Sequence, residues 1–459
     1  MGSTSAARQR ILALLDENSF VEIGAGVRAR ATDFNLDPAD APSDGVITGY
    51  GVIDDSLVYV YSQDSEVLGG SIGEMHAKKI TALYDLAIRT GAPVIGLLDS
   101  AGLRVQEGAD TLDAFARLYG QQARASGVVP QITAVFGRCG GGLAVAASLS
   151  DFTLMEEGAQ LFVNAPNTLA GNYEEKNNTA SAKSRAAAGC VDYVGTEGDV
   201  LAKIRMLAGL LPSNFEDDSA QDCEDVLNRD CPGVAASLED PAAVVSQTAD
   251  EGTFIELKPD FAADMMTAFA RFGGTTAGVI GNRDQLLTAD GCSKAADFVR
   301  FCDAFGLPVI TLTNVTGFAA TIGEENRVGL AAAKLTAAFA GATVPKVNVI
   351  TKKAVGSAYA VMNSKGTGAD LTLALPGAVI GIMDAALAAR VIAPDADRSE
   401  LEQTKKNYEA KQNSLDAAAA RGLVDQIAEP SDLRRYLIGA LEVLYTKREE
   451  MPARKHSSR

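Results

Sequence analysis

Three consecutive glycines in the segment GRCGGGLAVAASL, residues 137–149, stand directly before an alanine-rich stretch that is typical of a helix. Glycine is costly in an ordered backbone, so such a run indicates a turn that lets another group approach the main chain closely. The first N–H groups of a helix lack intrahelical acceptors and carry partial positive charge. The pattern predicts a strand that ends near Phe136, a turn over 137–142, and a helix from about Leu143 whose first N–H groups face a ligand oxygen.

A second turn, the segment SAGL from Ser100 to Leu103, follows the neighbouring predicted strand. Backbone N–H groups from two such turns could hold one negatively charged oxygen between them. Enzymes stabilise enolates and tetrahedral intermediates in this way, and one donor contributes ~3 kcal/mol. Two alternatives remain for a glycine turn taken alone. A nucleotide-phosphate loop would need GxGxxG spacing, which GRCGGG lacks, and a purely structural tight turn would need no ligand.

The same arrangement recurs later in the chain. The segment Ala92–Leu103 aligns without a gap with Leu307–Phe318, at an offset of 215 residues (92 onto 307), and the same offset carries Lys79 onto Lys294. The turn NVTGF, which ends at Phe318, therefore matches the first turn. In the second glycine turn Gly356 and Ser357 take the places of Gly141 and Gly142, and serine keeps the backbone N–H. One shared offset across distant anchors indicates an internal duplication.

Each copy alternates short apolar strands with helical patterns. The runs at 93–99, 130–137, 308–314 and 345–352 are rich in branched residues and typical of buried strands. Helical patterns cover 77–91 and 110–127. This alternation predicts parallel pairing with right-handed crossovers, and hence an α/β module that is present twice. The acidic stretch at 213–233 is expected to be a surface segment between the copies.

Composition excludes several classes of function. The formal net charge of −18 disfavours nucleic acid and anionic membranes as main partners, although a local basic patch could still bind an anionic ligand. Two histidines, six scattered cysteines without a CxxC pair, and the lack of GxSxG, GxxxxGK[ST] and HExxH argue against a histidine-dependent hydrolase, a metal site or an ATPase. With no apolar run of membrane-spanning length and no signal peptide, a cytoplasmic protein with reduced thiols and no membrane insertion is expected.

At these turns the sequence resembles the carboxyltransferase subunits of biotin-dependent acyl-CoA carboxylases and decarboxylases. The segments that carry the resemblance follow the family's order along nearly the whole chain. They are DGVITGYGVID at 44–54, SQDSEVLGGSIGEMHAKKI at 62–80, GAPVIGLLDSAGLRVQEG at 91–108, GVVPQITAVFGRCGGG at 127–142, FVRFCDAFGLPV at 298–309, ATVPKVNVITKKAVGSAY at 342–359, NSKGTGAD at 363–370 and KREEMPARKH at 447–456.

The resemblance implies two tandem crotonase-like domains, at 1–232 on the acyl-CoA side and at 233–459 on the biotin side. By match, the N–H groups of Leu103 and of Gly141 or Gly142 hold the thioester oxygen as the enolate forms. Those of Phe318, Ser357 and Ala358 hold the ureido oxygen of biotin. The remaining matched positions are substrate-binding or shape the turns, and Ala360 stands where the family sets acyl size. They are Gly102, Arg104, Gly317, Gly356 and Ala360.

The resemblance also implies partners and a substrate class. The activity is carboxyl transfer between biotin and the α carbon of a short acyl-CoA of propionyl/methylmalonyl, acetyl/malonyl or glutaconyl type. The chain has no MKM biotinylation site and no ATP-binding glycine loop, so biotin is expected on a separate carrier protein. A biotin carboxylase or a membrane decarboxylase subunit would complete the complex. A homo-oligomer, from dimer to hexamer, is expected to place the first domain of one chain against the second domain of another.

The chain departs from the family pattern at several turns. Asn314 and Thr316 replace aspartate and proline, Arg138 and Gly140 replace proline and alanine, and the region 166–180 lacks a glutamate-leucine-glycine-glycine segment. These departures bear on acyl-chain preference and leave two alternatives open. One is a catalytically weakened scaffold subunit of the same complex. The other is a biotin-independent crotonase-like enzyme, for which Glu107 and Glu157 are the candidate acid and base.

Overall fold

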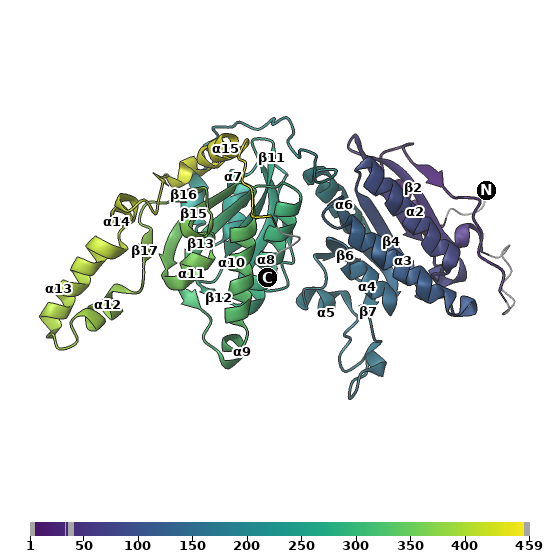
Figure 1. Cartoon of the computed structure of the whole chain (residues 1–459), viewed down its shortest axis with the longest axis horizontal. Helices are drawn as coiled ribbons and strands as arrows, with labels where there is room; N and C mark the ends of the chain where they lie inside the picture. Colours follow the sequence, from purple (N-terminus) through teal and green to yellow (C-terminus); the bar gives the residue numbers. More distant parts are fainter. Residues whose placement is uncertain (1–4, 33, 35–40, 454–459) are drawn as a thin grey trace. The chain divides into compact units, whose positions relative to one another are not determined.

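The computed structural model describes residues 5–32, 34 and 41–453. The chain divides into two compact units, unit 1 at Met1–Asp218 and unit 2 at Ser219–Arg459. Each unit is built on an eight-stranded, largely parallel sheet (Figure 1). The two units are described separately below.

The sheet of unit 1 has the strand order β1-β2-β3-β4-β5-β6-β8, and β7 pairs with the far end of β5. Its strands are β1 (Val21–Ile23), β2 (Val46–Ile53), β3 (Ser56–Gln63), β4 (Val94–Ser100), β5 (Gln131–Gly140), β6 (Phe152–Glu156), β7 (Gln160–Phe162) and β8 (Tyr193–Gly195). β1, β2 and β3 are antiparallel, and all pairs from β3 onward are parallel. The expected parallel α/β core is therefore confirmed, with an antiparallel edge that the alternation did not predict.

Helices cover the sheet of unit 1. They are α1 (Ala6–Leu14), α2 (Glu74–Thr90), α3 (Asp110–Ala125), α4 (Gly142–Ser148), α5 (Ala182–Ala187) and α6 (Glu197–Leu210). The two long helices predicted at 77–91 and 110–127 are α2 and α3. Their apolar residues, among them Ile80, Leu83 and Leu118, pack on Val94 and Val135 of the sheet. Burial of this apolar stripe fixes the helices on the strands and so fixes where the strand ends lie.

The sheet of unit 2 repeats the same order. Its strands are β9 (Ile255–Leu257), β10 (Met265–Phe272), β11 (Thr275–Asn282), β13 (Val309–Val315), β15 (Lys346–Val355), β16 (Leu371–Ala374), β17 (Val379–Gly381) and β18 (Gln426–Ile427). A separate two-stranded sheet joins β12 (Leu286–Leu287) to β14 (Gly317–Phe318). The order β9-β10-β11-β13-β15-β16-β18, with β17 on β15, matches unit 1 strand for strand. The duplication is thus a duplication of topology.

Within the described ranges, unit 2 has more helices than unit 1. They are α7 (Pro241–Thr248), α8 (Ala289–Ala304), α9 (Ile322–Glu325), α10 (Val328–Gly341), α11 (Gly356–Val361), α12 (Ala385–Ile392), α13 (Arg398–Tyr408), α14 (Leu415–Ala420) and α15 (Leu433–Leu444). Figure 1 shows α12, α13 and α14 projecting from the sheet of unit 2 as an arm. A π-helix at Glu409–Asn413 joins α13 to α14. The arm follows β17 in the chain. β17 pairs with β15, the strand that leads into the second glycine turn.

β5 is longer than the sequence predicts. Phe136 is the expected last strand residue, but the strand continues to Gly140. The extension forms because Arg138, Cys139 and Gly140 pair in parallel with Gln160–Phe162 of β7. The glycines that suggested a turn are therefore strand residues up to Gly140, and the helix α4 begins at Gly142, close to the expected start.

The acidic segment between the copies is irregular, as expected, but its C-terminal part packs on unit 2. Cys231 is buried in the unit 2 core, and Arg229 donates hydrogen bonds to the carbonyl oxygens of Gln247 and Ala249 at 2.8 and 2.9 Å. The sequence places the domain boundary between residues 232 and 233, whereas the compact units meet between 218 and 219. The boundary of the functional domains stays a prediction.

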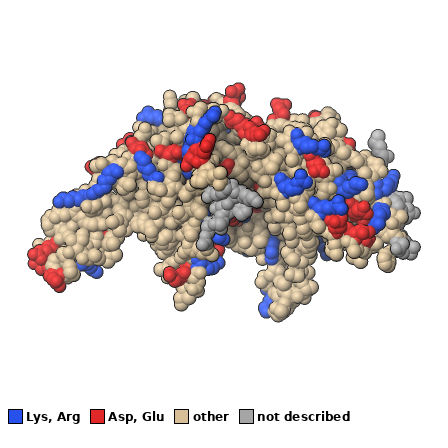
Figure 2. All heavy atoms as spheres, in the orientation of Figure 1, with Lys and Arg blue, Asp and Glu red and all other residues tan. Residues whose placement is uncertain are grey.

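The surface is not uniformly acidic. Figure 2 shows basic and acidic side chains interspersed on the displayed face of each unit. Among the described residues, no helix is both long enough and apolar enough to cross a membrane. All six cysteines are free thiols.

Candidate active site

The first turn presents the N–H of Leu103. β4 ends at Ser100, and Gly102 has a positive φ of 95° that favours glycine. Ile72 donates to the carbonyl of Gly102 at 2.8 Å and accepts from the N–H of Arg104 at 3.0 Å. These two bonds flank Leu103, so its own N–H points away from Ile72. That N–H has no acceptor among the described residues, and Leu103 is partly exposed.

The glycine turn presents the N–H of Gly142. Gly141 has a φ of 61°, and its N–H donates to the carbonyl of Phe162 at 2.9 Å. This bond consumes the Gly141 donor. Gly142 is the first residue of α4, so its N–H has no intrahelical acceptor, and it finds none elsewhere in the described chain. Tyr119 donates to the Gly142 carbonyl at 2.6 Å and so fixes the next peptide, between Gly142 and Leu143.

The two turns of unit 1 adjoin because β4 and β5 are neighbouring parallel strands. Ser100 pairs with Cys139 after a register shift, which brings the strand ends together. A Cβ at Gly102 would lie 3.3 Å from the carbonyl oxygen of Gly140, so the two backbones are close. Two unpaired N–H groups, from Leu103 and Gly142, therefore occupy one edge of the sheet. Such a pair can hold one oxyanion.

Unit 2 repeats the first turn at Phe318. The N–H of Thr316 donates to Gln285 at 2.8 Å, and the N–H of Ala319 donates to Leu287 at 2.9 Å. Leu287 is the ladder partner of Phe318. In a parallel ladder Leu287 bonds to the residues on either side of Phe318, so the N–H of Phe318 points away from Leu287. The family's proline at position 316 would lack this N–H, so the departure to threonine adds one backbone hydrogen bond.

The second glycine turn starts α11. Gly356 has a φ of 66°, Ser357 is exposed, and Ala358 is buried. The N–H groups of Ser357 and Ala358 belong to the first turn of the helix and have no intrahelical acceptor, whereas Gly356 directly follows Val355, which pairs with Gly381 of β17. Val315 of β13 pairs with Ala354 of β15, so this turn adjoins the Phe318 turn as in unit 1.

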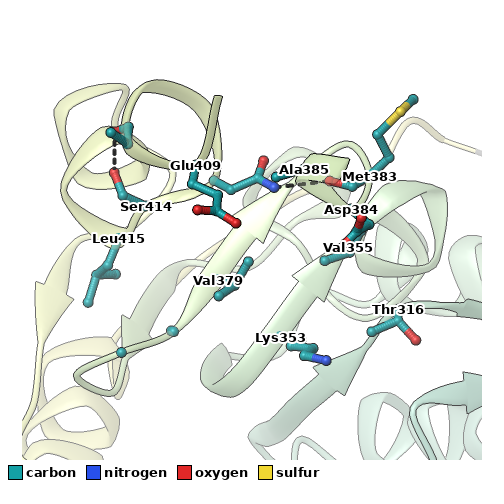
Figure 3. A pocket seen from close by; sticks show the side chains of 14 residues that line it. Thr316, Lys353, Val355, Val379, Met383, Asp384, Ala385, Glu409, Ser414 and Leu415 are labelled. Carbon is teal, nitrogen blue, oxygen red and sulfur yellow. Dashed lines mark hydrogen bonds between the residues drawn. The ribbon is translucent and has the colours of Figure 1, made fainter. Parts of the chain in front are cut away.

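Two cavities flank the second glycine turn. One, of about 390 Å³, has Gly356, Ser357 and Tyr359 in its wall. The other, of about 670 Å³, is bounded by Thr316, Lys353 and other residues (Figure 3). In that view Lys353 lies on one side of the cavity and Glu409 of the π-helix on the other. Ala360 is exposed one turn into α11.

Arg104 lies under the first turn rather than on its surface. Its side chain has no exposed area and pairs with Asp44 and with Glu107, the latter at 2.9 Å. Its other donors bond to the hydroxyl and carbonyl oxygens of Ser71. The sequence predicts that Arg104 is a substrate-binding residue, and this stays a prediction; in the structure its guanidinium has no exposed surface. The side chain ties the turn to Asp44, Glu107 and Ser71. Asp44 and Ser71, which sequence reasoning missed, stand in two of the quoted family segments.

His76, the histidine among the described residues, is not available as an acid or base at this site. His76 is fully buried, its Nδ1 lies 2.9 Å from the carbonyl oxygen of Asp44, and its Nε2 lies 3.3 Å from the side-chain nitrogen of Gln63. The carbonyl requires a proton on Nδ1, and the amide N–H requires a lone pair on Nε2, so the ring is neutral. Burial, followed by the charge of Arg104, lowers the pKa of His76 to about 3.

The candidate acid–base pair of the biotin-independent alternative is not free. Both carboxylate oxygens of Glu107 are used, one by Arg104 and the other by the N–H of Glu74 at 2.6 Å. Glu107 is buried, whereas Glu157 is exposed in the turn after β6. The described side chains also contain no group of three or more potential metal ligands.

Comparison with known proteins agrees with this geometry. The carboxyl transferase domain model matches residues 3–458. Methylmalonyl-CoA decarboxylase subunit alpha of Propionigenium modestum is 37% identical, with 98% of this chain and 92% of that protein covered. Propionyl-CoA carboxylase beta chain of Saccharopolyspora erythraea is 39% identical, with 98% and 90% covered. A crystal structure of transcarboxylase 12S, a hexamer with methylmalonyl-coenzyme A and methylmalonic acid bound, has a TM-score of 0.93 at 34% identity and covers 100% of this chain and 93% of its own.

These matches define a carboxyltransferase built from two tandem crotonase-like domains. The chain belongs to the carboxyl transferase domain family, and the family predicted from its motifs is confirmed.

Proposed function

We propose that this chain moves a carboxyl group between biotin on a separate carrier protein and the α carbon of a short acyl-CoA. The observation that supports this most is the pair of adjoining turns in each unit, which direct N–H groups without acceptors to one sheet edge. Neutral N–H donors suit an enolate oxygen on one substrate and a ureido oxygen on the other. Each donor held in place before the reaction contributes ~3 kcal/mol to the transition state.

In unit 1 we assign the thioester oxygen to Leu103 and Gly142. The N–H of Gly141 already donates to Phe162, so Gly141 shapes the turn, as does Gly102. As the α carbon gains or loses the carboxyl group, negative charge moves onto the thioester oxygen. The two N–H groups stabilise that charge without a side-chain base, which agrees with a neutral, buried His76.

In unit 2 we assign the ureido oxygen of biotin to Phe318, Ser357 and Ala358, with Gly317 and Gly356 shaping the turns. A cavity of about 390 Å³ whose wall includes Gly356 and Ser357 has room for a bicyclic urea. Biotin, when bound, supplies or accepts the carboxyl group. We assign acyl-size selection to Ala360, which is exposed and small.

We propose that the active oligomer places unit 1 of one copy against unit 2 of another. The supporting observation is the apolar face of α12, where Leu387, Val391 and Ile392 are more than half exposed. The transcarboxylase 12S relative is a hexamer. A biotin carboxyl carrier protein, and either a biotin carboxylase or a membrane decarboxylase subunit, would complete the complex in the cytoplasm.

Transfer of label tests this function directly. Methylmalonyl-CoA labelled in its free carboxyl group is incubated with the chain and a biotinylated carrier protein, and labelled carrier is counted. We expect label on the carrier that depends on both proteins. No label from methylmalonyl-, malonyl- or glutaconyl-CoA would contradict the proposal.

Two further measurements distinguish the carboxyltransferase from the scaffold subunit and from the biotin-independent enzyme. Absence of a thermal shift at excess CoA ester would favour the scaffold, because ligand at ~100 times Kd raises stability by ~2.7 kcal/mol. Turnover of acyl-CoA without any carrier would favour a biotin-independent enzyme.

A further inference from the structure

The first turn of unit 1 is tied to a buried ionic cluster that its counterpart in unit 2 lacks. Arg104 directly follows Leu103, and its guanidinium contacts Asp44, Glu107 and Ser71, all with buried side chains. At the offset of the duplication, position 104 falls on Ala319, which has no charged group. The difference lies at the turn that we assign to the enolate oxygen.

Both units share the rest of the support. Glu107 accepts from the N–H of Glu74, at the start of α2, at 2.6 Å. Glu324 accepts from the N–H of Ala289, at the start of α8, also at 2.6 Å. Ala289 is the residue that matches Glu74 in the duplication. A carboxylate that caps the helix start is therefore common to both modules. In unit 2 it pairs at 3.7 Å with Arg327, whose side chain is about half exposed, whereas unit 1 has a fully buried arginine directly after the turn.

The cluster joins three separate segments at the turn. Asp44 precedes β2, and its second carboxylate oxygen accepts from the N–H of His76 in α2 at 2.7 Å. Ser71 precedes Ile72, which brackets Leu103 through its backbone. Gly73 leaves the space for the cluster, because a Cβ there would lie 2.2 Å from Glu107 and 2.6 Å from Arg104. The Leu103 peptide is thus fixed to the loop before β2 and to the start of α2.

We propose that Arg104 is a positioning residue that holds the N–H of Leu103 in the orientation that stabilises the enolate oxygen. The inference rests on the function proposed above. The guanidinium acts through geometry rather than through its charge, since the two buried carboxylates that contact it more than offset that charge. A donor that is already held in place need not reorganise as charge develops, and a shift of about 1 Å can cost ~100-fold in rate.

The test compares Arg104→Lys with a matched control in unit 2. Lysine keeps the charge but cannot bridge Asp44, Glu107 and Ser71 at once. Arg434 is also fully buried and pairs with Asp250 at 2.7 Å, and none of its partners belongs to a turn with a predicted donor. Arg434→Lys therefore measures the general cost of loosening a buried arginine.

Two ligands report on the donor. One is a CoA thioether that ends in a nitronate, whose charged oxygen imitates the enolate, and the other is S-propyl-CoA, which has no such oxygen. For Arg104→Lys we expect at least ~10-fold weaker nitronate binding, with S-propyl-CoA affinity within about twofold of the parent. Arg434→Lys should leave both affinities unchanged. Equal losses for both ligands, or no loss, would overturn the positioning role.

A second measurement keeps the inference separate from the proposed function. Hydrogen exchange of the Arg104 N–H, which is bonded to Ile72, should be at least ~10-fold faster in Arg104→Lys if the anchor loosens the turn. Unchanged exchange would overturn the anchor. Failure of the parent chain to prefer the nitronate over S-propyl-CoA would instead overturn the enolate function.

If Arg104→Lys does not assemble, Glu107→Gln serves as the second variant, with Glu324→Gln as its counterpart in unit 2. Glutamine keeps an acceptor for the helix N–H and weakens only the contact with the arginine. A selective loss of nitronate affinity in Glu107→Gln, absent in Glu324→Gln, is the expected result. Loss in both variants would contradict a role confined to the first turn.

Discussion

Individual residues divide into those that a motif locates and those that only burial explains. Leu103 and Gly142, whose roles stay predictions, lie in turns that the sequence marks with glycines after apolar strands. The role of Arg104 is not found from the sequence, since its partner Asp44 stands 60 positions earlier and the sequence alone does not bring them together. Gly141 likewise looks equivalent to Gly142 until its N–H is seen to donate to Phe162.

His76 makes unit 1 sensitive to acid. The pKa of His76 is lowered to about 3, from an ordinary value of 6.5, because its imidazole is buried. Between pH 3 and pH 6.5 the imidazole of His76 is protonated in the unfolded chain but not in the folded one. Its contribution to the free energy of unfolding is therefore fully present above pH 6.5 and is lost as the pH drops toward 3. The slope is about 1.4 kcal/mol per pH unit from this group.

Thermal unfolding at pH 7.5, 6 and 5 checks this, with His76→Gln as the comparison. The melting temperature of the parent should fall more steeply with acid than that of the variant, in which the imidazole no longer titrates. Parallel curves would show that the ring is already protonated or exposed.

At the scale of elements, apolar periodicity predicted the strands and the long helices, and tertiary pairing decided the rest. β4, β13, α2 and α3 lie where the pattern predicts them. β5 runs beyond its predicted end because β7, a strand without a strong signal, pairs with it. The hairpin of β2 and β3 was missed, although its turn residues Asp54 and Asp55 both have positive φ, a conformation that aspartate tolerates.

The lysine that the duplication carries from position 79 to 294 holds the loop before each central hairpin. Lys79 donates to carbonyl oxygens of Ser43 and Val46, and Lys294 donates to those of Lys258 and Phe261 at 2.7 and 2.9 Å. Burial lowers the pKa of each to about 8. Removing the amine would leave these carbonyl oxygens, of which only that of Val46 is fully buried, without their donor, and an unpaired buried group costs ~1–3 kcal/mol.

In Lys79→Met and in Lys294→Met, amide hydrogen exchange should therefore become faster only in the loop that the replaced lysine contacts. Protection should fall around residues 43–46 in the first variant and around 258–261 in the second. A loss of protection at both loops in either variant would contradict independent local anchors.

The whole molecule contains one module twice, and we propose that the two copies bind two chemically different oxygens. The single offset made the duplication visible in the sequence, and the strand orders of both sheets agree with it. The sequence could not reveal that the two first turns are held differently. Arg104 lies in a buried ionic cluster under the turn of unit 1, whereas the matching residue in unit 2 is the neutral Ala319. We interpret this as specialisation of the first unit for the oxygen that carries more charge.

The central claim is that the N–H of Gly142 holds the enolate oxygen, and Gly142→Pro beside Gly142→Ala tests it most directly. Either substitution places a Cβ about 2.7 Å from the Tyr119 hydroxyl, but only proline removes the N–H. Transfer of labelled carboxyl from methylmalonyl-CoA to the biotinylated carrier is measured for both. The account predicts a loss of at least ~100-fold beyond that of the alanine variant, with the oligomer intact. Equal rates for the two variants would contradict it.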